Sequence, residues 1–315
     1  MYEIKQPSNI IMGKNSCSEF RFDDNCLIIT SQGAKARGWL EYLGIKNFLI
    51  YDKVESNPRI EICQDIIDEF SKSKISNVIG LGGGSSMDVA KYVGHNMKKN
   101  KILIPTTFGS GSEVTRISVL KVNNKKQSFH NDGLFADMSI IDSHFINNTP
   151  EIVFKNSFVD ALAQCSEGFD SKLGNSYTQF FCKKAFDYLE RGFMNKNNDD
   201  IVLGSLLSGI GFGNCSTTLG HALSYVFSNE GVSHGHALAF TTTVSHKFNN
   251  SIFFQRFQDL IKKLNFESIK LKLNSQDASE VILKDRKHLD NNPKLVTKKD
   301  IIGLLDIINS GNSLD

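Results

Sequence analysis

The feature that most constrains the fold is a run of three glycines, Gly82 to Gly84, between an apolar segment and an amphipathic one. Residues 77–81 form the apolar segment, and the amphipathic one continues to Val93. Glycines let the backbone approach a bulky anion without a clash from Cβ. The N–H groups at the start of a following helix would point at that anion. Because the stretch matches neither G-x-G-x-x-G nor G-x-x-x-x-G-K-S/T, we expect a phosphate-binding turn outside both standard fingerprints.

Around this turn, strand-like and helix-like segments alternate through the first half of the chain. We expect strands at residues 10–12, 26–30, 46–51, 78–81, 101–105 and 138–142, with helices at residues 39–43 and 60–70. Such alternation predicts a parallel sheet with right-handed crossovers, and ligands bind beyond the carboxyl ends of its strands, where Gly82 and Thr106 would lie. Thr106, Thr107 and Ser110 would form either a locally capped turn or a second wall for a phosphate or ribose.

The pattern changes near residues 149–151, and no convincing strand follows. Apolar residues recur at helical spacing in residues 158–169, 176–191, 199–212 and 218–227. The sequence therefore predicts two domains. The first, residues 1–149, would be an α/β domain with a parallel sheet, and the second, residues 150–315, would be all-α.

Composition argues against several classes of function. The formal net charge of +2 gives no electrostatic footprint for nucleic acid or an acidic membrane. No apolar run reaches transmembrane length, and the N-terminus lacks the design of a signal peptide. The six cysteines are scattered without a C-x-x-C pair, which indicates reduced thiols. We therefore expect a cytoplasmic enzyme that acts on a small molecule, with neither nucleic acid nor membrane as a partner.

Four polar residues of the second half are candidates for a metal site. Asp160 and Gln164 lie four residues apart, so they share one face of the expected helix. Read alone, they would be helix surface or a buried hydrogen-bonded pair. His221 lies early in one helix and His234 opens the next, so the two flank one loop. With a carboxylate in the same domain, a divalent metal site and two ordinary structural histidines both stay open.

Several motifs occur together in the order of one known family. They are residues 81–91 (LGGGSSMDVAK), 105–115 (PTTFGSGSEVT), 160–162 (DAL), 221–223 (HAL), 234–235 (HG) and 291–293 (NNP). In these motifs the chain resembles the iron-containing (group III) alcohol dehydrogenases, which are related to the dehydroquinate synthase fold. The resemblance covers nearly the whole chain. It implies a nucleotide-binding α/β domain, a helical domain that binds metal and substrate, and a possible homodimer.

The resemblance implies a divalent metal ligated by Asp160, His221 and His234. The usual fourth ligand of the family is a histidine, and here that position is Gln164, whose amide oxygen is a harder and weaker donor. The family implies iron(II), with zinc(II) and manganese(II) as alternatives. A second departure is Tyr225, where many members carry a histidine near the substrate.

The resemblance also implies a nicotinamide cofactor. The positions that match the family's cofactor-binding residues are Ser31, Asn57, Gly83, Gly84, Ser85, Asp88, Thr106, Thr107, Ser110 and Lys126. NAD-specific folds usually place an acid after the second strand, whereas here the strand is followed by Ser31. Without that carboxylate, Lys35 or Arg37 could neutralise a 2′-phosphate. We therefore expect NADPH to be accepted, alongside NADH or in preference to it.

Shorter motifs resemble a narrower branch, the phosphonoacetaldehyde reductases. They are residues 160–164 (DALAQ), 221–225 (HALSY), 234–237 (HGHA) and 126–130 (KQSFH). A phosphonate dianion needs cations and hydrogen-bond donors close to it, and Arg116, Lys126, Ser128 and His130 could supply them. The alternative is an ordinary polar hairpin with solvated lysines.

These interpretations lead to one expected reaction and to several alternatives. We expect hydride transfer from a nicotinamide to an aldehyde, giving a primary alcohol, with the metal polarising the carbonyl. His236, Tyr225 or a water chain would deliver the proton, and His236 could instead only support the metal site. The alternatives are a general iron-dependent alcohol dehydrogenase for another aldehyde, a sugar-phosphate cyclase of the dehydroquinate synthase type, and a non-catalytic ligand-binding descendant.

Overall fold

The computed structural model describes residues 1–123 and 125–314 and divides into two compact units. One unit spans Ile4–Thr149, and the other begins at Pro150 and includes Met1–Glu3. The first three residues belong to the second unit, where the Tyr2 hydroxyl lies 2.9 Å from Ser176 Oγ. The unit of Ile4–Thr149 is called here the α/β unit, and the other the helical unit.

A six-stranded parallel sheet forms the centre of the α/β unit, in the order β1-β8-β5-β4-β2-β3. Its strands are β1 (Ile10–Met12), β2 (Cys26–Ile29), β3 (Phe48–Tyr51), β4 (Asn77–Gly82), β5 (Asn100–Pro105) and β8 (Met138–Ile141). All six residues of β4 are buried, as expected for a central strand covered on both faces. The prediction of a parallel α/β sheet is confirmed.

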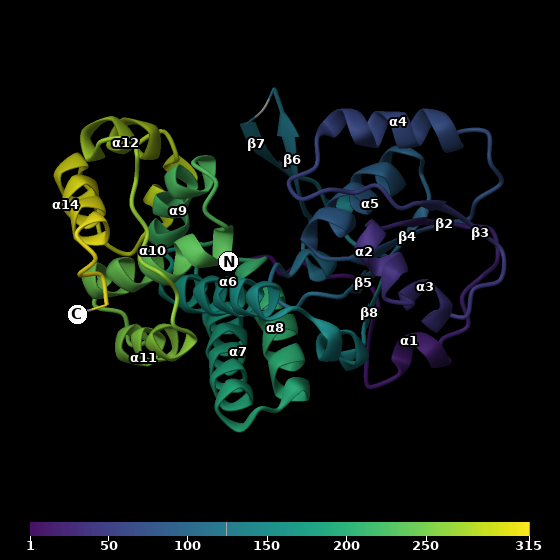
Figure 1. Ribbon diagram of the computed structural model, residues 1–315, viewed down its shortest axis with the longest axis horizontal. Coiled ribbons are helices and arrows are strands. Elements are labelled where there is room, and N and C mark those ends of the chain that lie inside the picture. The colour runs from purple at the N-terminus through teal and green to yellow at the C-terminus, as the bar shows by residue number, and fades with distance from the viewer. Residues whose placement is uncertain (124, 315) are drawn as a thin grey trace. The chain divides into compact units, whose positions relative to one another are not determined.

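Helices lie on both sides of this sheet (Figure 1). They are α1 (Ser16–Glu19), α2 (Gln32–Ala36), α3 (Trp39–Tyr42), α4 (Ile60–Phe70) and α5 (Gly84–Asn96), with short 3₁₀ turns η1 (Ser112–Val114), η2 (Asp132–Leu134) and η3 (Ser143–Asn148). Side chains of α4 and α5, such as Ile66 and Val89, pack on Leu27 of β2 and Val78 of β4 in one buried cluster. This packing fixes the start of α5 beside the end of β4.

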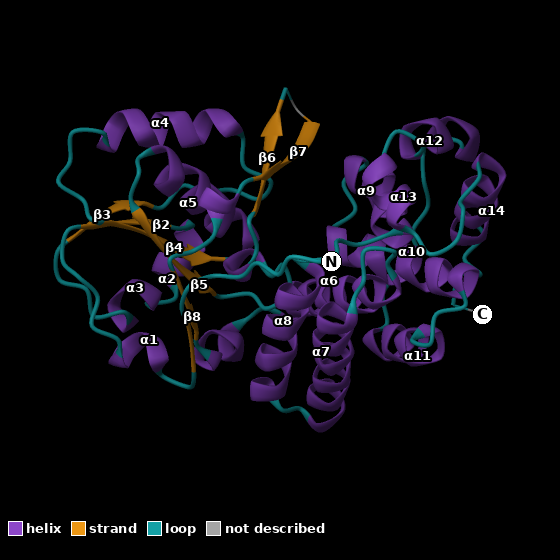
Figure 2. Ribbon diagram, turned by 180° about the vertical axis from the view of Figure 1, so that it is seen from behind, coloured by secondary structure: helices purple, strands orange, loops and turns teal. Residues whose placement is uncertain are grey.

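A two-stranded antiparallel hairpin, separate from the main sheet, completes the α/β unit (Figure 2). It consists of β6 (Ile117–Val122) and β7 (Lys125–His130). Leu120 and Phe129 join the cluster around α5, and the Phe129 ring meets Tyr92 edge-on at 5.6 Å. The opposite face of β7 therefore carries Lys126, Ser128 and His130, because side chains alternate along a strand. All three are exposed.

The helical unit contains nine helices and no strand among its described residues. They are α6 (Glu151–Asp170), α7 (Ser176–Asn195), α8 (Asn198–Phe212), α9 (Leu219–Asn229), α10 (His234–Asn249), α11 (Phe254–Leu264), α12 (Ser275–Ile282), α13 (Arg286–Asn291) and α14 (Lys298–Asn309). Helix α6 is packed by α7, α8 and α10, so the middle of its sequence is almost entirely buried. The all-α prediction for this half is confirmed.

Two further observations bear on the class of protein. All six cysteines are buried with free thiols. In the part of the chain that the structure describes, no helix combines the length and the apolar character needed to cross a bilayer.

Candidate functional site

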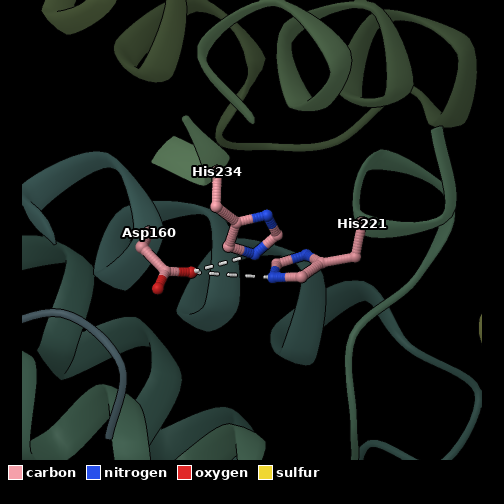
Figure 3. A group of neighbouring side chains, drawn as sticks. All are labelled: Asp160, His221 and His234. Atoms are coloured by element: carbon pink, nitrogen blue, oxygen red, sulfur yellow. Dashed lines mark ion pairs between the residues drawn. The ribbon is translucent and has the colours of Figure 1, made fainter. Parts of the chain in front are cut away.

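Three side chains of the helical unit converge on one point (Figure 3). Asp160 comes from α6, His221 from the first turn of α9, and His234 is the first residue of α10. The Nε2 atoms of both histidines lie 3.8 Å from Asp160 Oδ1, and one ligand atom from each residue falls within 4.8 Å of the others. We call these three residues the metal cluster.

The metal cluster fits a divalent cation. Ligands about 2.0–2.2 Å from a tetrahedral ion lie about 3.3–3.6 Å apart, close to the spacing observed here. Two imidazole nitrogens and a carboxylate oxygen suit the first-row divalent metals. The side chain of His221 is 7% exposed, whereas that of His234 is 32% exposed, so the cluster is buried on one side and accessible on the other.

His221 is held from both sides by carboxylates of α6. Its Nδ1 lies 3.1 Å from Glu167 Oε2, while its Nε2 faces Asp160. Burial alone would lower the pKa of His221, but the negative charges of Glu167 and Asp160 outweigh burial and raise this pKa to about 9. Burial likewise opposes ionisation of Glu167, but His221 and the Thr218 N–H bring its pKa down to about 2. The site therefore favours positive charge.

Gln164, predicted as the fourth ligand, contacts the cluster through Asp160. Its amide Nε2 donates to Asp160 Oδ1 at 2.9 Å. In this arrangement the side chain holds the carboxylate in place. Ligation of a metal through the amide oxygen stays a proposal.

Tyr225 lies beside the cluster, together with two residues that the sequence did not single out. Its ring stacks on His234 at 6.3 Å and lies 5.8 Å from the ring of His288. His288 is buried, its ring lies 6.2 Å from that of His221, and its Nδ1 is 2.7 Å from Asp285 Oδ2. Asp285 and His288 are three residues apart at the start of α13, and this spacing is the signal that could have revealed them.

His236, the other expected proton donor, is engaged elsewhere. Its Nε2 lies 2.6 Å from the carbonyl oxygen of Glu267, and its ring stacks on Phe266 at 4.9 Å. Residues two apart on a helix point to nearly opposite sides, so His236 faces away from His234. These contacts occupy Nε2 and one face of the His236 ring, and its role as proton donor stays a prediction.

Eight of the ten expected cofactor residues follow the carboxyl ends of strands in the α/β unit, whereas Asp88 lies within α5 and Lys126 on β7. Six of them line the ends of β4 and β5 and are called here the cofactor wall: Gly83, Gly84, Ser85, Thr106, Thr107 and Ser110. The two loops pack closely, since the Thr106 N–H donates to the Gly82 carbonyl at 2.9 Å. A Cβ on Gly83 would lie 3.0 Å from Thr107 Oγ1, and one on Gly84 would lie 3.1 Å from Ser110 Oγ. A side chain at either position would therefore crowd the hydroxyl group that faces it.

Asp88, another expected cofactor residue, makes several contacts within the α/β unit. Its Oδ1 accepts a hydrogen bond from Ser112 Oγ at 2.6 Å and lies 3.2 Å from Lys91 Nζ. Its Oδ2 accepts from the Val119 N–H at 3.0 Å. Both oxygens are thus used within the protein, and the residue is 8% exposed. Asp88 therefore fixes η1 and β6 against α5, and its assignment as a cofactor contact stays a prediction.

Ser31 and Asn57 lie at the same edge of the sheet, after β2 and β3. Ser31 is the N-cap residue of α2, and Asn57 has a positive φ of 55° in the turn before α4. Of the two cations expected to neutralise a 2′-phosphate, Lys35 lies 3.6 Å from Asp52 Oδ2. The Arg37 guanidinium lies over the Trp39 ring at 5.1 Å. Both cations therefore already have neighbours.

Three of the four expected substrate residues lie on the exposed face of the hairpin, and the fourth, Arg116, is half-buried just before it. Lys126, Ser128 and His130 share the outer face of β7, and Arg116 lies beside its end, where the Asn131 N–H donates to the Arg116 carbonyl at 3.2 Å. The Arg116 guanidinium pairs with Asp132 at 2.7 Å, and Asp132 also accepts from Lys5 Nζ.

Family models account for most of the chain. The model described as iron-containing alcohol dehydrogenase matches residues 7–143, and that of the C-terminal part of the Fe-containing alcohol dehydrogenase family matches residues 155–295. The protein therefore belongs to the iron-containing alcohol dehydrogenase family. This confirms the family resemblance and agrees with the expected metal and nicotinamide cofactors.

Curated relatives match part of their length. A 4-hydroxybutyrate dehydrogenase from Clostridium kluyveri is 35% identical over 209 residues, which are 57% of this chain and 56% of the relative. A sulfoacetaldehyde reductase from Bilophila wadsworthia is 29% identical over 229 residues, which are 64% of this chain and 59% of the relative. The matched region thus spans less than two thirds of these relatives.

Solved structures share the fold over their whole length. The iron-containing alcohol dehydrogenase from Thermococcus thioreducens has a TM-score of 0.88 at 20% identity, covering 99% of this chain and 100% of that one. A sulfoacetaldehyde reductase from Bifidobacterium kashiwanohense, solved with NAD+, has a TM-score of 0.86 at 22% identity, covering 98% and 99%.

Proposed function

We propose that this protein is a metal-dependent NAD(P)H oxidoreductase that reduces a small aldehyde to a primary alcohol. The observation that carries the proposal is the convergence of Asp160, His221 and His234 within 4.8 Å, in a chain of this family. A divalent cation bound there would polarise a carbonyl oxygen and stabilise the negative charge that develops on it. The reduced nicotinamide would supply the hydride to the carbonyl carbon.

The remaining tasks fall to the chain's own side chains and backbone. The N–H groups at the start of α5 would bind the cofactor's phosphates, because that helix end carries partial positive charge. Tyr225 is the candidate proton donor that the structure keeps beside the cluster, and burial raises the pKa of its hydroxyl, so that it holds its proton. Tyr225 would therefore donate a hydrogen bond to the oxygen of the substrate.

The substrate we favour is phosphonoacetaldehyde, which would give 2-hydroxyethylphosphonate. Two kinds of observation support an aldehyde with an anionic tail. The hairpin presents Arg116, Lys126, Ser128 and His130 as cations and hydrogen-bond donors. In addition, the names of two relatives specify a carboxylate and a sulfonate compound.

The test is NADPH and NADH oxidation with phosphonoacetaldehyde, sulfoacetaldehyde, succinic semialdehyde and propanal, for enzyme loaded with iron(II), zinc(II) or manganese(II). We expect kcat/KM for phosphonoacetaldehyde to exceed that for propanal by about 10-fold or more, as for one charge-assisted contact. Lys126→Ala should reduce this preference, whereas Lys125→Ala, on the other face of β7, should not.

Each outcome of this test has a distinct meaning. Equal kcat/KM for charged and uncharged aldehydes would reject the phosphonate proposal and leave a general alcohol dehydrogenase. No oxidation of either cofactor with any aldehyde would reject the dehydrogenase proposal. Release of inorganic phosphate from a sugar phosphate, without net cofactor oxidation, would instead indicate a cyclase.

A further inference from the structure

Glu167 is a buried acid with no assigned role, and it contacts one side of the metal cluster. It lies on α6 seven residues after Asp160, which is close to two turns, so the two carboxylates lie on the same side of this helix. Asp160 faces Nε2 of His221 and Glu167 faces Nδ1 of the same ring. Two carboxylates on one face of α6 therefore contact the two ring nitrogens of His221.

The position of the Glu167 carboxylate is fixed by two further hydrogen bonds. Oε2 accepts a hydrogen bond from the Thr218 N–H at 2.6 Å, at the N-terminus of α9. Oε1 accepts from Thr242 Oγ1 of α10 at 3.3 Å. The carboxylate fits there because residue 220 is glycine: a Cβ on Gly220 would lie 2.0 Å from Oε1. Glu167 thus connects α6, α9 and α10, the three helices that carry the metal cluster.

We propose that Glu167 is a positioning residue of the metal site, which sets the tautomer and the ring orientation of His221. This inference rests on the proposed function, because it gives His221 the role of a metal ligand. An ionised carboxylate can only accept hydrogen bonds, so Nδ1 of a neutral His221 must carry the hydrogen. The lone pair then lies on Nε2, the atom that faces Asp160. Such carboxylate–histidine pairs also raise the basicity of the ligating nitrogen.

Two substitutions separate the hydrogen bond from the charge. Glu167→Gln removes the charge, but the amide oxygen can still accept from Nδ1. Glu167→Met has a similar size and removes the acceptor altogether. Asp170→Asn is the matched control, because Asp170 is a poorly exposed carboxylate on the same helix that lies 3.7 Å from Nδ1 of a different histidine, His246.

The experiment is a zinc(II) titration of the metal-free full chain, with a chromophoric chelator as competitor and with thermal unfolding to confirm the fold. We expect Glu167→Met to bind zinc about 10- to 100-fold more weakly than the wild type, as for other outer partners of metal ligands. Glu167→Gln should fall between them, and Asp170→Asn should stay within about twofold of wild type. Folded Glu167 variants that both bind zinc like the wild type would overturn the proposal.

A second measurement requires no change at Glu167 and serves if Glu167→Met does not fold. In ¹⁵N NMR of the zinc-loaded wild type, the His221 signals are assigned by their loss in His221→Asn. We expect Nδ1 to carry hydrogen and Nε2 to bind zinc, and the reverse pattern would refute the role of Glu167. Neither measurement uses cofactor or aldehyde. Their failure is thus distinguishable from failure of the proposed function, which would show as correct zinc binding without aldehyde reduction.

Discussion

The cofactor wall of the α/β unit and the metal cluster of the helical unit are built from different parts of the chain. The wall consists of glycines, small hydroxyls and backbone N–H groups at the ends of β4 and β5. The metal cluster consists of three polar side chains, and each comes from a different helix. The cofactor wall, which is built largely from backbone, needs space for the ligand to approach. The metal cluster, which is built from side chains, needs neighbouring residues that hold each ring and carboxylate in place.

Buried acids show the same contrast. In the α/β unit, Asp88 and Glu113 lie near the buried Lys91 and serve the fold, since Lys91 Nζ also donates to the Ser112 carbonyl at 2.9 Å. In the helical unit, Asp160 and Glu167 both contact His221. Burial of a carboxylate alone therefore does not mark a functional site. What its oxygens contact decides the role.

The largest effect should come from removing a ligand of the metal cluster. His221→Ala should abolish stoichiometric zinc binding and lower kcat/KM for the aldehyde by about 1,000-fold or more, because several kcal/mol of charge stabilisation are lost. The checks are metal analysis and steady-state kinetics. His95→Ala, an exposed histidine of the α/β unit, is the control and should change neither. Activity retained by a metal-free His221→Ala protein would show that the metal cluster is not needed for catalysis.

Filling the space of the cofactor wall should give the next largest effect. Gly83 has φ −76° and ψ −175°, which any residue can adopt, so Gly83→Val would act by occupying space rather than by straining the backbone. We expect KM for NADPH to rise about 10- to 100-fold, as for a misplaced ligand, with zinc affinity unchanged. Gly13→Val is the control, because a Cβ there meets nothing within 4 Å. An unchanged KM would show that this wall does not bind the cofactor.

A stability measurement should distinguish the structural acid of the α/β unit from Glu167. Burial raises the pKa of Glu113 to about 7. The positive charge of Lys91 opposes this shift, and the negative charge of Asp88 adds a smaller increase. Between about pH 4.5 and pH 7 the folded state keeps a proton that the unfolded chain releases, so this contribution to stability is lost as pH rises. Relative to Glu113→Gln, the wild type should lose about 2 kcal/mol of unfolding free energy over that range.

Denaturant unfolding of the full chain at several pH values measures this difference. Glu113→Gln should leave zinc affinity unchanged, in contrast to Glu167→Gln. Parallel pH curves for wild type and Glu113→Gln would contradict the raised pKa.

Cofactor preference should show the smallest effect. Ser31→Asp places a carboxylate after β2, where it would accept a hydrogen bond from a ribose 2′-hydroxyl and repel a 2′-phosphate. We expect the ratio of kcat/KM for NADPH to that for NADH to fall about 10-fold. Ser31→Ala should leave the ratio near that of the wild type. A wild type that uses NADH clearly better than NADPH would exclude a preference for the phosphorylated cofactor.

The parts of this molecule that local patterns encode were predictable from the sequence. Apolar runs marked the strands of the main sheet, and the glycine turn marked the start of α5. The hairpin was expected only as an alternative to a substrate-binding segment, because β7 is polar along most of its length and Phe129 is its one apolar residue. A strand is recognised from apolar residues at every second position, and β7 has only one apolar residue.

The three residues of the metal cluster were predicted from sequence motifs, but the residues that support them were not. Glu167 looks like one more acid in a helix until α9 places His221 against it. His288 likewise gains significance only from its neighbours Tyr225 and His221. Conversely, Asp88 matched a cofactor position in the motif, although its oxygens are used by η1 and β6. Tertiary contacts decide these roles, and no local pattern records them.

The most direct measurement of the central claim is a crystal structure of the zinc-loaded protein with anomalous diffraction data collected at the zinc edge. We expect one ion, bound by Nε2 of His221, Nε2 of His234 and Oδ1 of Asp160. An ion located away from these three atoms, or none in protein prepared with excess zinc, would show that the three residues are not a metal site.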